Sequence, residues 1–363
     1  MKIAIVGAGI VGSTAAYYLS KEKDVEVTVF DHGLGQATKA AAGIISPWFS
    51  KRRNKAWYRM ARLGADFYQE LTSNLENDGY DTSFYDQSGV VLLKKDDSKL
   101  DGLYQHAETR LEESPIIGEL SIKNADNLPE FTGFDRYLYA SGGARVEGAE
   151  LTATLINASG FEKVEGPVTL SSLDNGSYEI NCQTFDKVIL ACGAWLGQTL
   201  EPLGFEVDVR PQKGQLRDYF FDGLDTGKLP VLMPEGELDV IPFAGGKISV
   251  GASHENDKGF DLTVDEAILE GLEEEAKTYF PDLSTAKSFS ERVGTRAYTS
   301  DFSPFFGEVP ELKNVFVASG LGSSGLTTGP LIGKNLVDLA MNRSGSLDSA
   351  DYPVTQYVRK KEQ

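Results

Sequence analysis

The stretch Met1-Lys-Ile-Ala-Ile-Val-Gly-Ala-Gly-Ile-Val-Gly-Ser13 decides how this chain folds. It opens with an apolar run typical of a buried strand, continues into glycines spaced GxGxxG, and leads into a helical pattern. The next apolar stretch, Val25-Glu-Val-Thr-Val-Phe-Asp31, is typical of a second strand that ends in a carboxylate. Strand, glycine turn, helix and strand in this order are the layout of a dinucleotide-binding βαβ unit.

The glycines and the acid each have a physical task in such a unit. Gly7 permits the tight turn, Gly9 lets the backbone approach a pyrophosphate, and Gly12 lets helix and strand pack closely. The helix N-terminus offers unpaired N–H groups and the positive end of its dipole to the phosphates. Asp31 lies about 20 residues beyond the glycines, where a carboxylate binds the ribose hydroxyls. We therefore predict that this chain binds a dinucleotide.

Composition limits the partners. The chain has 363 residues, enough for two domains with separate cores. Its 54 acidic and 35 basic residues give a formal net charge of −19, which repels nucleic acid and anionic membranes but not a dinucleotide held by backbone amides. Residues 2–20 share an apolar stretch with signal peptides, but the glycine spacing favours the βαβ unit. No apolar run reaches the roughly 18 residues of a membrane span, so we expect a cytoplasmic protein without a transmembrane segment.

Cysteines and histidines are too few for several kinds of site. The chain has two cysteines, Cys182 and Cys192, and three histidines, His32, His106 and His254. Neither CxxC nor HExxH spacing occurs, so we expect no disulfide framework and no metal site. A histidine-dependent catalytic triad is equally disfavoured.

Periodicity and turn signals predict elements along the whole chain. We expect a helix over residues 51–76, strands at 89–93, 185–193, 239–243, 247–251 and 314–320, and a hairpin of 168–170 with 178–182. Thr263-Val-Asp-Glu266 has the pattern of a capping box and predicts a helix that ends before Pro281. A last helix is expected from Leu331 to Met341, with Pro330 in its first turn.

Three remote strands end in glycine, at Gly7, Gly193 and Gly320. In a doubly wound α/β fold, ligands bind at the carboxyl ends of parallel strands. We therefore predict an α/β protein with a Rossmann-type domain formed by residues 1–50, 141–210 and 291–345. Residues 51–140 and 211–290 would form a second, mixed-sheet α+β substrate domain.

Several further segments carry a resemblance to a known family. They are Thr38–Pro47, Gly143–Leu151 with Glu147-Gly148 in place of Asp-Pro, Phe185–Trp195, Arg210–Leu216, Gly294-Thr-Arg296 followed by Ala297 instead of proline, and Gly320–Thr327 with Leu321 instead of histidine. In this order they resemble the D-amino-acid oxidase-like FAD-dependent oxidoreductases over nearly the whole chain. The resemblance implies noncovalently bound FAD, because neither cysteine lies near the Gly294–Arg296 segment.

The resemblance and the fingerprint together assign residues to the cofactor. Those expected to bind FAD are Gly7, Ala8, Gly9, Ile10, Val11, Gly12, Asp31, His32, Ala41, Ala42, Gly43, Ile44, Val168, Ala191, Gly193, Trp195, Gly320, Leu321, Gly322, Ser323, Ser324, Gly325, Leu326 and Thr327. The small side chains of 40–43 let the backbone lie against a flat ring. The N–H groups of 320–327 would stabilise negative charge at the pyrimidine end of the flavin. For Trp195, plain core packing is the alternative.

The same resemblance implies the substrate and the reaction. Arg296 is expected to bind the carboxylate of a small amino acid, because a guanidinium fork matches a carboxylate. We expect a D-amino acid, oxidised at its amine by hydride transfer to flavin N5. The alternatives are a glycine- or sarcosine-type amine oxidase and a flavin-binding protein without amine oxidation. Oxygen or a carrier would take the electrons; Leu321 in place of histidine favours a carrier. The oligomeric state cannot be read from the sequence.

Overall fold

Strand β1 (Lys2–Val6) lies inside the first of two large sheets in the computed structural model, which describes residues 1–362. Its side chains alternate as a strand buried on both faces requires: Ile3 and Ile5 join one core, and Ala4 and Val6 join another. The sheet has six strands in the order β20 (Phe305–Glu308), β21 (Val315–Ser319), β13 (Lys187–Leu190), β1, β2 (Glu26–Asp31) and β9 (Glu162–Glu165). All neighbours are parallel except β20 and β21.

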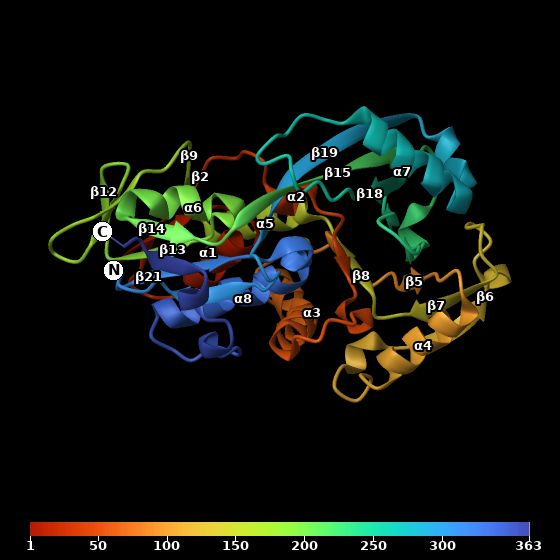
Figure 1. The fold of residues 1–363 in the computed structure, drawn as a ribbon, viewed down its shortest axis with the longest axis horizontal. Coiled ribbons are helices and arrows are strands. Elements are labelled where there is room, and N and C mark those ends of the chain that lie inside the picture. The colour runs from red at the N-terminus through yellow and green to blue at the C-terminus, as the bar shows by residue number, and fades with distance from the viewer. Residues whose placement is uncertain (363) are drawn as a thin grey trace.

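Helices and small sheets cover the two faces of this sheet (Figure 1). On one face lie α1 (Ile10–Leu19), α5 (Gly148–Ser159) and α8 (Gly325–Ala340), with α3 (Lys55–Asn77) packed on α8. The other face packs on α6 (Leu196–Leu200) and on a small sheet of β10 (Leu170–Ser172), β11 (Tyr178–Ile180) and β12 (Gln183–Phe185). A pair of short strands, β14 (Phe205–Val207) and β22 (Val358–Lys360), lies beside α6.

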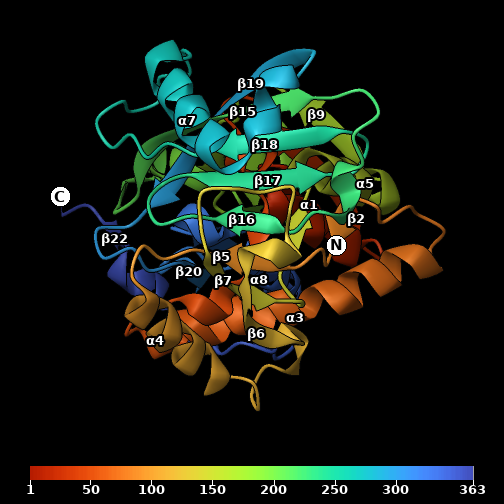
Figure 2. The same ribbon diagram turned by 90° about the vertical axis from the view of Figure 1, so that its right-hand side faces the viewer.

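The second large sheet is mixed and has eight strands (Figure 2). Their order is β19 (Ser288–Tyr298), β15 (Arg210–Phe220), β18 (Lys247–Gly251), β17 (Asp239–Phe243), β16 (Val231–Met233), β5 (Val90–Leu92), β7 (Arg136–Ala140) and β6 (Leu120–Asn124). Helix α7 (Glu266–Tyr279) packs on β15 and β18, and α4 (Asp97–Glu108) on β6 and β7. Strands β3 (Ile44–Ile45), β8 (Ala144–Val146) and β4 (Tyr85–Asp86) form a three-stranded sheet, and α2 (Ala37–Ala40) packs on β19.

The predicted α/β architecture with a mixed second sheet is confirmed. The carboxyl ends of β1, β13 and β21 lie side by side, so the turns after Val6, Leu190 and Ser319 meet at one edge. The stretch 185–193 divides at Asp186, because the Asp186 amide and carboxylate both bond to the backbone of Lys2. The domain boundaries stay a prediction; residues 291–298, assigned to the first domain, pair within the second sheet.

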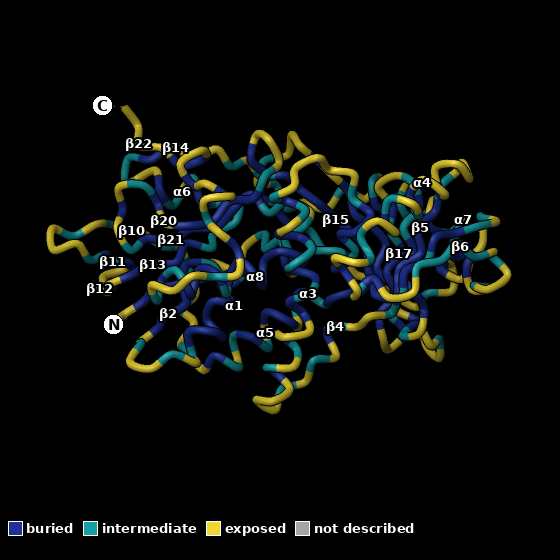
Figure 3. Tube along the Cα trace, turned by 90° about the horizontal axis from the view of Figure 1, so that it is seen from below, coloured by how far each residue is buried: buried dark blue, intermediate teal, exposed yellow. Residues whose placement is uncertain are grey.

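The buried segments follow the two sheets, and the exposed ones lie in loops at the rim (Figure 3). No helix within residues 1–362 is long and apolar enough to cross a membrane.

The predicted start of the last helix is wrong. Helix α8 begins at Gly325, so Pro330 lies inside it rather than in its first turn. A proline has no N–H, so the carbonyl of Leu326 loses its helical partner. The hydroxyl of the buried Tyr68 donates to that carbonyl at 2.7 Å and replaces the missing bond. The sequence pattern could not show this, since the replacement donor comes from α3.

The predicted capping box is also wrong. Helix α7 begins at Glu266 with Asp265 as its N-cap, and the Thr263 hydroxyl bonds to Asp261 instead of the helix. The side-chain oxygen of Gln215 accepts the Asp265 N–H at 2.9 Å. A tertiary partner on β15 therefore satisfies the amide at the helix start.

We expect Tyr68→Phe to lower the free energy of unfolding by about 1–3 kcal/mol, because it leaves the buried Leu326 carbonyl without a donor. Stacking on Tyr85 at 4.9 Å would survive the change. Urea denaturation measures the loss. The same substitution should cost less in a Pro330→Ala background, where the helix regains its own N–H. An equal loss in both backgrounds would show that the hydroxyl acts in another way.

Candidate functional site

The turn after β1 brings three backbone segments into contact. Gly7 has φ +101°, and a Cβ there would lie 2.3 Å from the carbonyl oxygen of Ala191. A Cβ on Gly12 would lie 1.8 Å from the carbonyl oxygen of Gly7. Only glycine fits both positions. Helix α1 begins immediately after Gly9 and carries no acidic side chain in its first turn. Its positive N-terminus is therefore open to an anionic ligand.

Asp31 ends β2 beside this turn. The Ala8 N–H donates to Asp31 Oδ1 at 3.2 Å, and the Gln36 side-chain amide donates to Oδ2. The carboxylate is thus oriented at the edge of the sheet where a ribose would lie.

A cavity of about 1120 Å³ runs from this turn to the second sheet. The residues predicted to bind the cofactor line it, except Ala8, Gly12 and Gly320. Ala8 donates its N–H to Asp31, while Gly12 and Gly320 serve as packing positions. A Cβ on Gly320, at φ +75°, would lie 2.8 Å from the Thr299 side chain. The lining includes Trp195, which also packs on Phe260 at 5.0 Å.

The shape and chemistry of the cavity fit a dinucleotide. Pockets for small ligands measure about 300–1,000 Å³, so this one can hold a large cofactor and a small substrate. The wall offers glycine turns at the ends of β1 and β13, two helix N-termini and the Asp31 carboxylate. No group of three or more metal-binding side chains occurs within residues 1–362.

Arg296 points into the same cavity from β19. Its Nη1 donates to the carbonyl of Ser253 at 2.8 Å and to Gln212 Oε1 at 3.2 Å. Among residues 1–362 no carboxylate lies within 4.0 Å of this guanidinium. Burial lowers its pKa. Arg217 and Arg292, by contrast, each pair with acidic side chains. Arg296 therefore keeps donors for an anion that enters the cavity.

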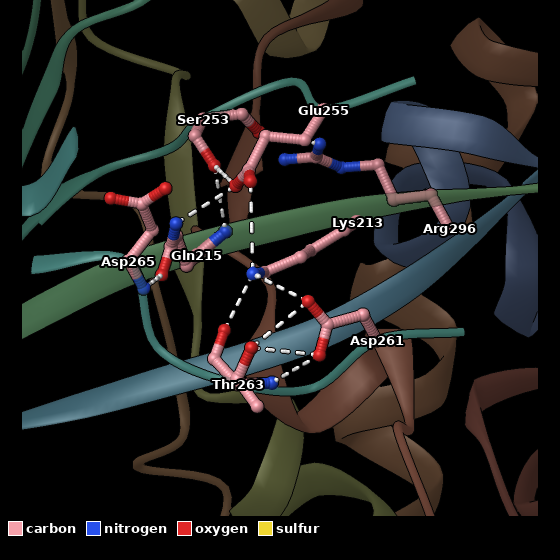
Figure 4. Close-up of polar contacts among 8 residues, drawn as sticks. All are labelled: Lys213, Gln215, Ser253, Glu255, Asp261, Thr263, Asp265 and Arg296. Atoms are coloured by element: carbon pink, nitrogen blue, oxygen red, sulfur yellow. Dashed lines mark hydrogen bonds and ion pairs between the residues drawn. The ribbon is translucent and has the colours of Figure 1, made fainter. Parts of the chain in front are cut away.

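A polar network next to Arg296 holds the backbone segment to which its guanidinium donates (Figure 4). Lys213 Nζ lies 3.7 Å from carboxylate oxygens of both Glu255 and Asp261 and donates to the Thr263 carbonyl. Glu255 Oε1 accepts bonds from Gln215 at 2.8 Å and from Ser253 at 2.7 Å. The backbone segment whose carbonyl accepts from Arg296 is thereby held in place.

Sequence reasoning missed six titratable residues of the cavity wall, which are Lys51, Lys94, Lys99, Glu235, Asp239 and His254. Burial raises the pKa of Asp239 to about 7. Burial and then the charge of Arg296 lower the pKa of His254. The sequence held one signal for Asp239, because an acidic residue there begins an otherwise apolar strand.

Comparison with known proteins agrees with this geometry. Residues 2–339 match the family described as FAD dependent oxidoreductase. An uncharacterised oxidoreductase of Bacillus subtilis is 37% identical, covering 96% of this chain and 97% of its own. Glycine oxidase of Pseudomonas aeruginosa is 30% identical, covering 97% and 98%. The crystal structure of iminodiacetate oxidase from Chelativorans sp. BNC1 superposes with a TM-score of 0.91 at 29% identity, covering 97% and 98%. This chain belongs to the FAD dependent oxidoreductase family and is an FAD-dependent oxidoreductase.

Proposed function

We propose that this protein oxidises the amine of a small α-amino acid, with the D enantiomer as the preferred chiral substrate. The unpaired guanidinium of Arg296 carries the proposal, because it lies in the same cavity as the glycine turns that fit FAD. The D preference rests on the family resemblance of the sequence. Glycine oxidase and iminodiacetate oxidase, among the similar proteins, have names that fit amine oxidation.

Each part of the site has a defined task in this proposal. Bound FAD supplies an acceptor for the hydride that leaves the α-carbon. Arg296 binds the substrate carboxylate and thereby fixes which hydrogen on the α-carbon faces the cofactor. Leu92, Met233 and Leu321 give the cavity an apolar lining, which would limit the access of water to a bound substrate.

A substrate with a second carboxylate is the other candidate, and two lysines favour it. Lys51 and Lys94 line the cavity, and neither has a carboxylate within 4.0 Å among residues 1–362. Iminodiacetate carries two carboxylates on a secondary amine, and the oxidase of that name shares this fold closely. An anaerobic screen with D- and L-amino acids, glycine, sarcosine and iminodiacetate distinguishes the candidates by bleaching of the yellow colour. If no amine bleaches the protein, amine oxidation is ruled out.

We expect Arg296→Leu to lower kcat/KM by about 30- to 800-fold, equivalent to about 2–4 kcal/mol, because a charge-assisted contact is lost. Arg296→Lys should lose less, since it keeps the charge without the fork. Steady-state kinetics measure both, with FAD content as the control for folding. Normal turnover by Arg296→Leu would place the carboxylate elsewhere.

We expect FAD to be held without a covalent bond. Cys192 lines the cavity, but burial raises the pKa of its thiol to about 12, which disfavours the nucleophilic thiolate. Cys182 is exposed and lies outside the cavity lining. Acid precipitation should leave FAD, identified by chromatography, in the supernatant. Flavin fluorescence on the denatured polypeptide would contradict this prediction.

We expect slow reoxidation by oxygen and faster turnover with an artificial dye. Leu321 lines the cavity at the position where the family that this sequence resembles has histidine. An imidazole that could stabilise developing negative charge is therefore missing. Stopped-flow absorbance after substrate reduction measures the rate in air-saturated buffer, and Leu321→His should raise it. Reoxidation by air as fast as reduction would make the protein an oxidase.

A further inference from the structure

Asp239 and Arg296 point to the same face of the eight-stranded sheet. In register, Asp239 pairs with Gly251, Gly251 with Leu216, and Leu216 with Arg292. Residues paired across a sheet share a face, and residues four apart on one strand share it too. Arg296 lies four residues beyond Arg292 on β19, so its side chain and that of Asp239 leave the sheet together. Both line the cavity.

The Asp239 carboxyl is half-buried and lacks the partners that two nearby buried acids have. Asp218 pairs with Arg292 at 2.9 Å, and Glu255 accepts from Gln215 and Ser253. For the Asp239 side chain, no hydrogen bond and no cation within 4.0 Å is found among residues 1–362, and desolvation in the cavity wall raises its pKa. Asp239 is half-buried and lines the cavity, so its carboxyl is free to meet a ligand there.

Asp239 and Arg296 both adjoin one short segment of chain. Asp239 pairs with Gly251, and Arg296 donates to the carbonyl of Ser253, two residues farther on. An amino acid carries its carboxylate and its ammonium on one carbon. A guanidinium and a carboxylate on the same cavity wall are the complement of that zwitterion.

We propose that Asp239 binds the substrate's amine and takes up its proton, an inference that rests on the proposed amino acid oxidation. One N–H bond of the ammonium breaks, its electron pair stays on nitrogen, and the proton forms an O–H bond with the Asp239 carboxylate. An ammonium has no lone pair to assist departure of hydride from the α-carbon, whereas the neutral amine has one. Asp239 thus works as the general base that prepares the substrate.

Other titratable groups face the same cavity and enter its pH dependence. They are Asp31, His32, Lys51, Lys94, Lys99, Cys192, Glu235, His254 and Arg296. On the strands beside Asp239, Met233 of β16 and Gly251 of β18 offer no titratable side chain. Glu235 lies 3.6 Å from Lys99, and Glu237 lies 3.7 Å from His254.

The test compares wild type with Asp239→Asn across pH 6 to 10, using whichever amino acid bleaches the holoenzyme. Alkylamines titrate near about pH 10, so under 1% of the free substrate is neutral at about pH 7.5. We expect Asp239→Asn to lose about 100-fold in kcat/KM at that pH and to recover about tenfold per unit as pH rises. Wild type should lose activity below pH 7, as Asp239 becomes protonated.

The control Asp126→Asn makes the same change at an exposed position outside the cavity lining and should keep the wild-type profile. A deficit in Asp239→Asn that is equal at every pH would reveal a structural role and overturn the proposal, as would no deficit. If wild type bleaches with no amino acid and binds none, the proposed function fails and this inference fails with it.

Binding by calorimetry gives a readout that does not depend on turnover. Acetate offers only a carboxylate, so its affinity should be the same in wild type and Asp239→Asn and lost in Arg296→Leu. The zwitterionic amino acid should bind more weakly to both variants. An Asp239→Asn variant that binds the amino acid as tightly as wild type would overturn the proposal.

The pH dependence of the Tm tests whether the Asp239 carboxyl has no partner in the folded protein. Because the folded pKa of Asp239 lies above its unfolded value, folding favours the protonated form, and stability is lost as pH rises toward 7. Asp239→Asn should therefore raise the Tm at pH 8 and change it little at pH 4. A lower Tm at pH 8 would reveal a stabilising partner of the carboxylate and overturn the proposal.

Discussion

The site depends on the close approach of backbone to backbone at Gly7. Any side chain there would collide with the Ala191 carbonyl, and any side chain at Gly12 would collide with Gly7 itself. Because both positions lack a Cβ, the N-terminus of α1 and the ends of β1 and β13 can border one cavity. Dinucleotide binding needs that geometry before any polar side chain matters.

The sequence predicts a structural feature well when the residues that determine it are neighbours in the chain, and poorly when they are remote. The βαβ unit and its Asp31 are local patterns, and the structure reproduces them. Pro330 and the start of α7 are misplaced because Tyr68 and Gln215, remote in sequence, supply the missing hydrogen-bond partners. Local chemistry at a helix end is predictable only where no tertiary partner competes for the same groups.

The substrate end of the site was harder to predict for a related reason. Arg296 stood out through a motif, but its freedom from carboxylates is a tertiary fact in a chain with 54 acidic residues. Asp239 stood in the sequence as one acid among many. What distinguishes it is the absence of any partner, and only the packing of β16, β17 and β18 around it reveals that. Functional residues often break the rules that govern the rest of the fold.

Strand β19, which carries Arg296, also contacts the loop that follows Asp31. The Thr295 N–H donates to the Gly35 carbonyl at 2.9 Å, and a Cβ on Gly294 would lie 2.7 Å from the Ala40 side chain. The loop after Asp31 is thus tied to the residue beside Arg296, the proposed substrate anchor. Hydride transfer is sensitive to small errors in position, so anchor and cofactor loop gain from sharing one rigid contact. The backbone bond between Thr295 and Gly35 therefore couples the position of Arg296 to that of the loop after Asp31.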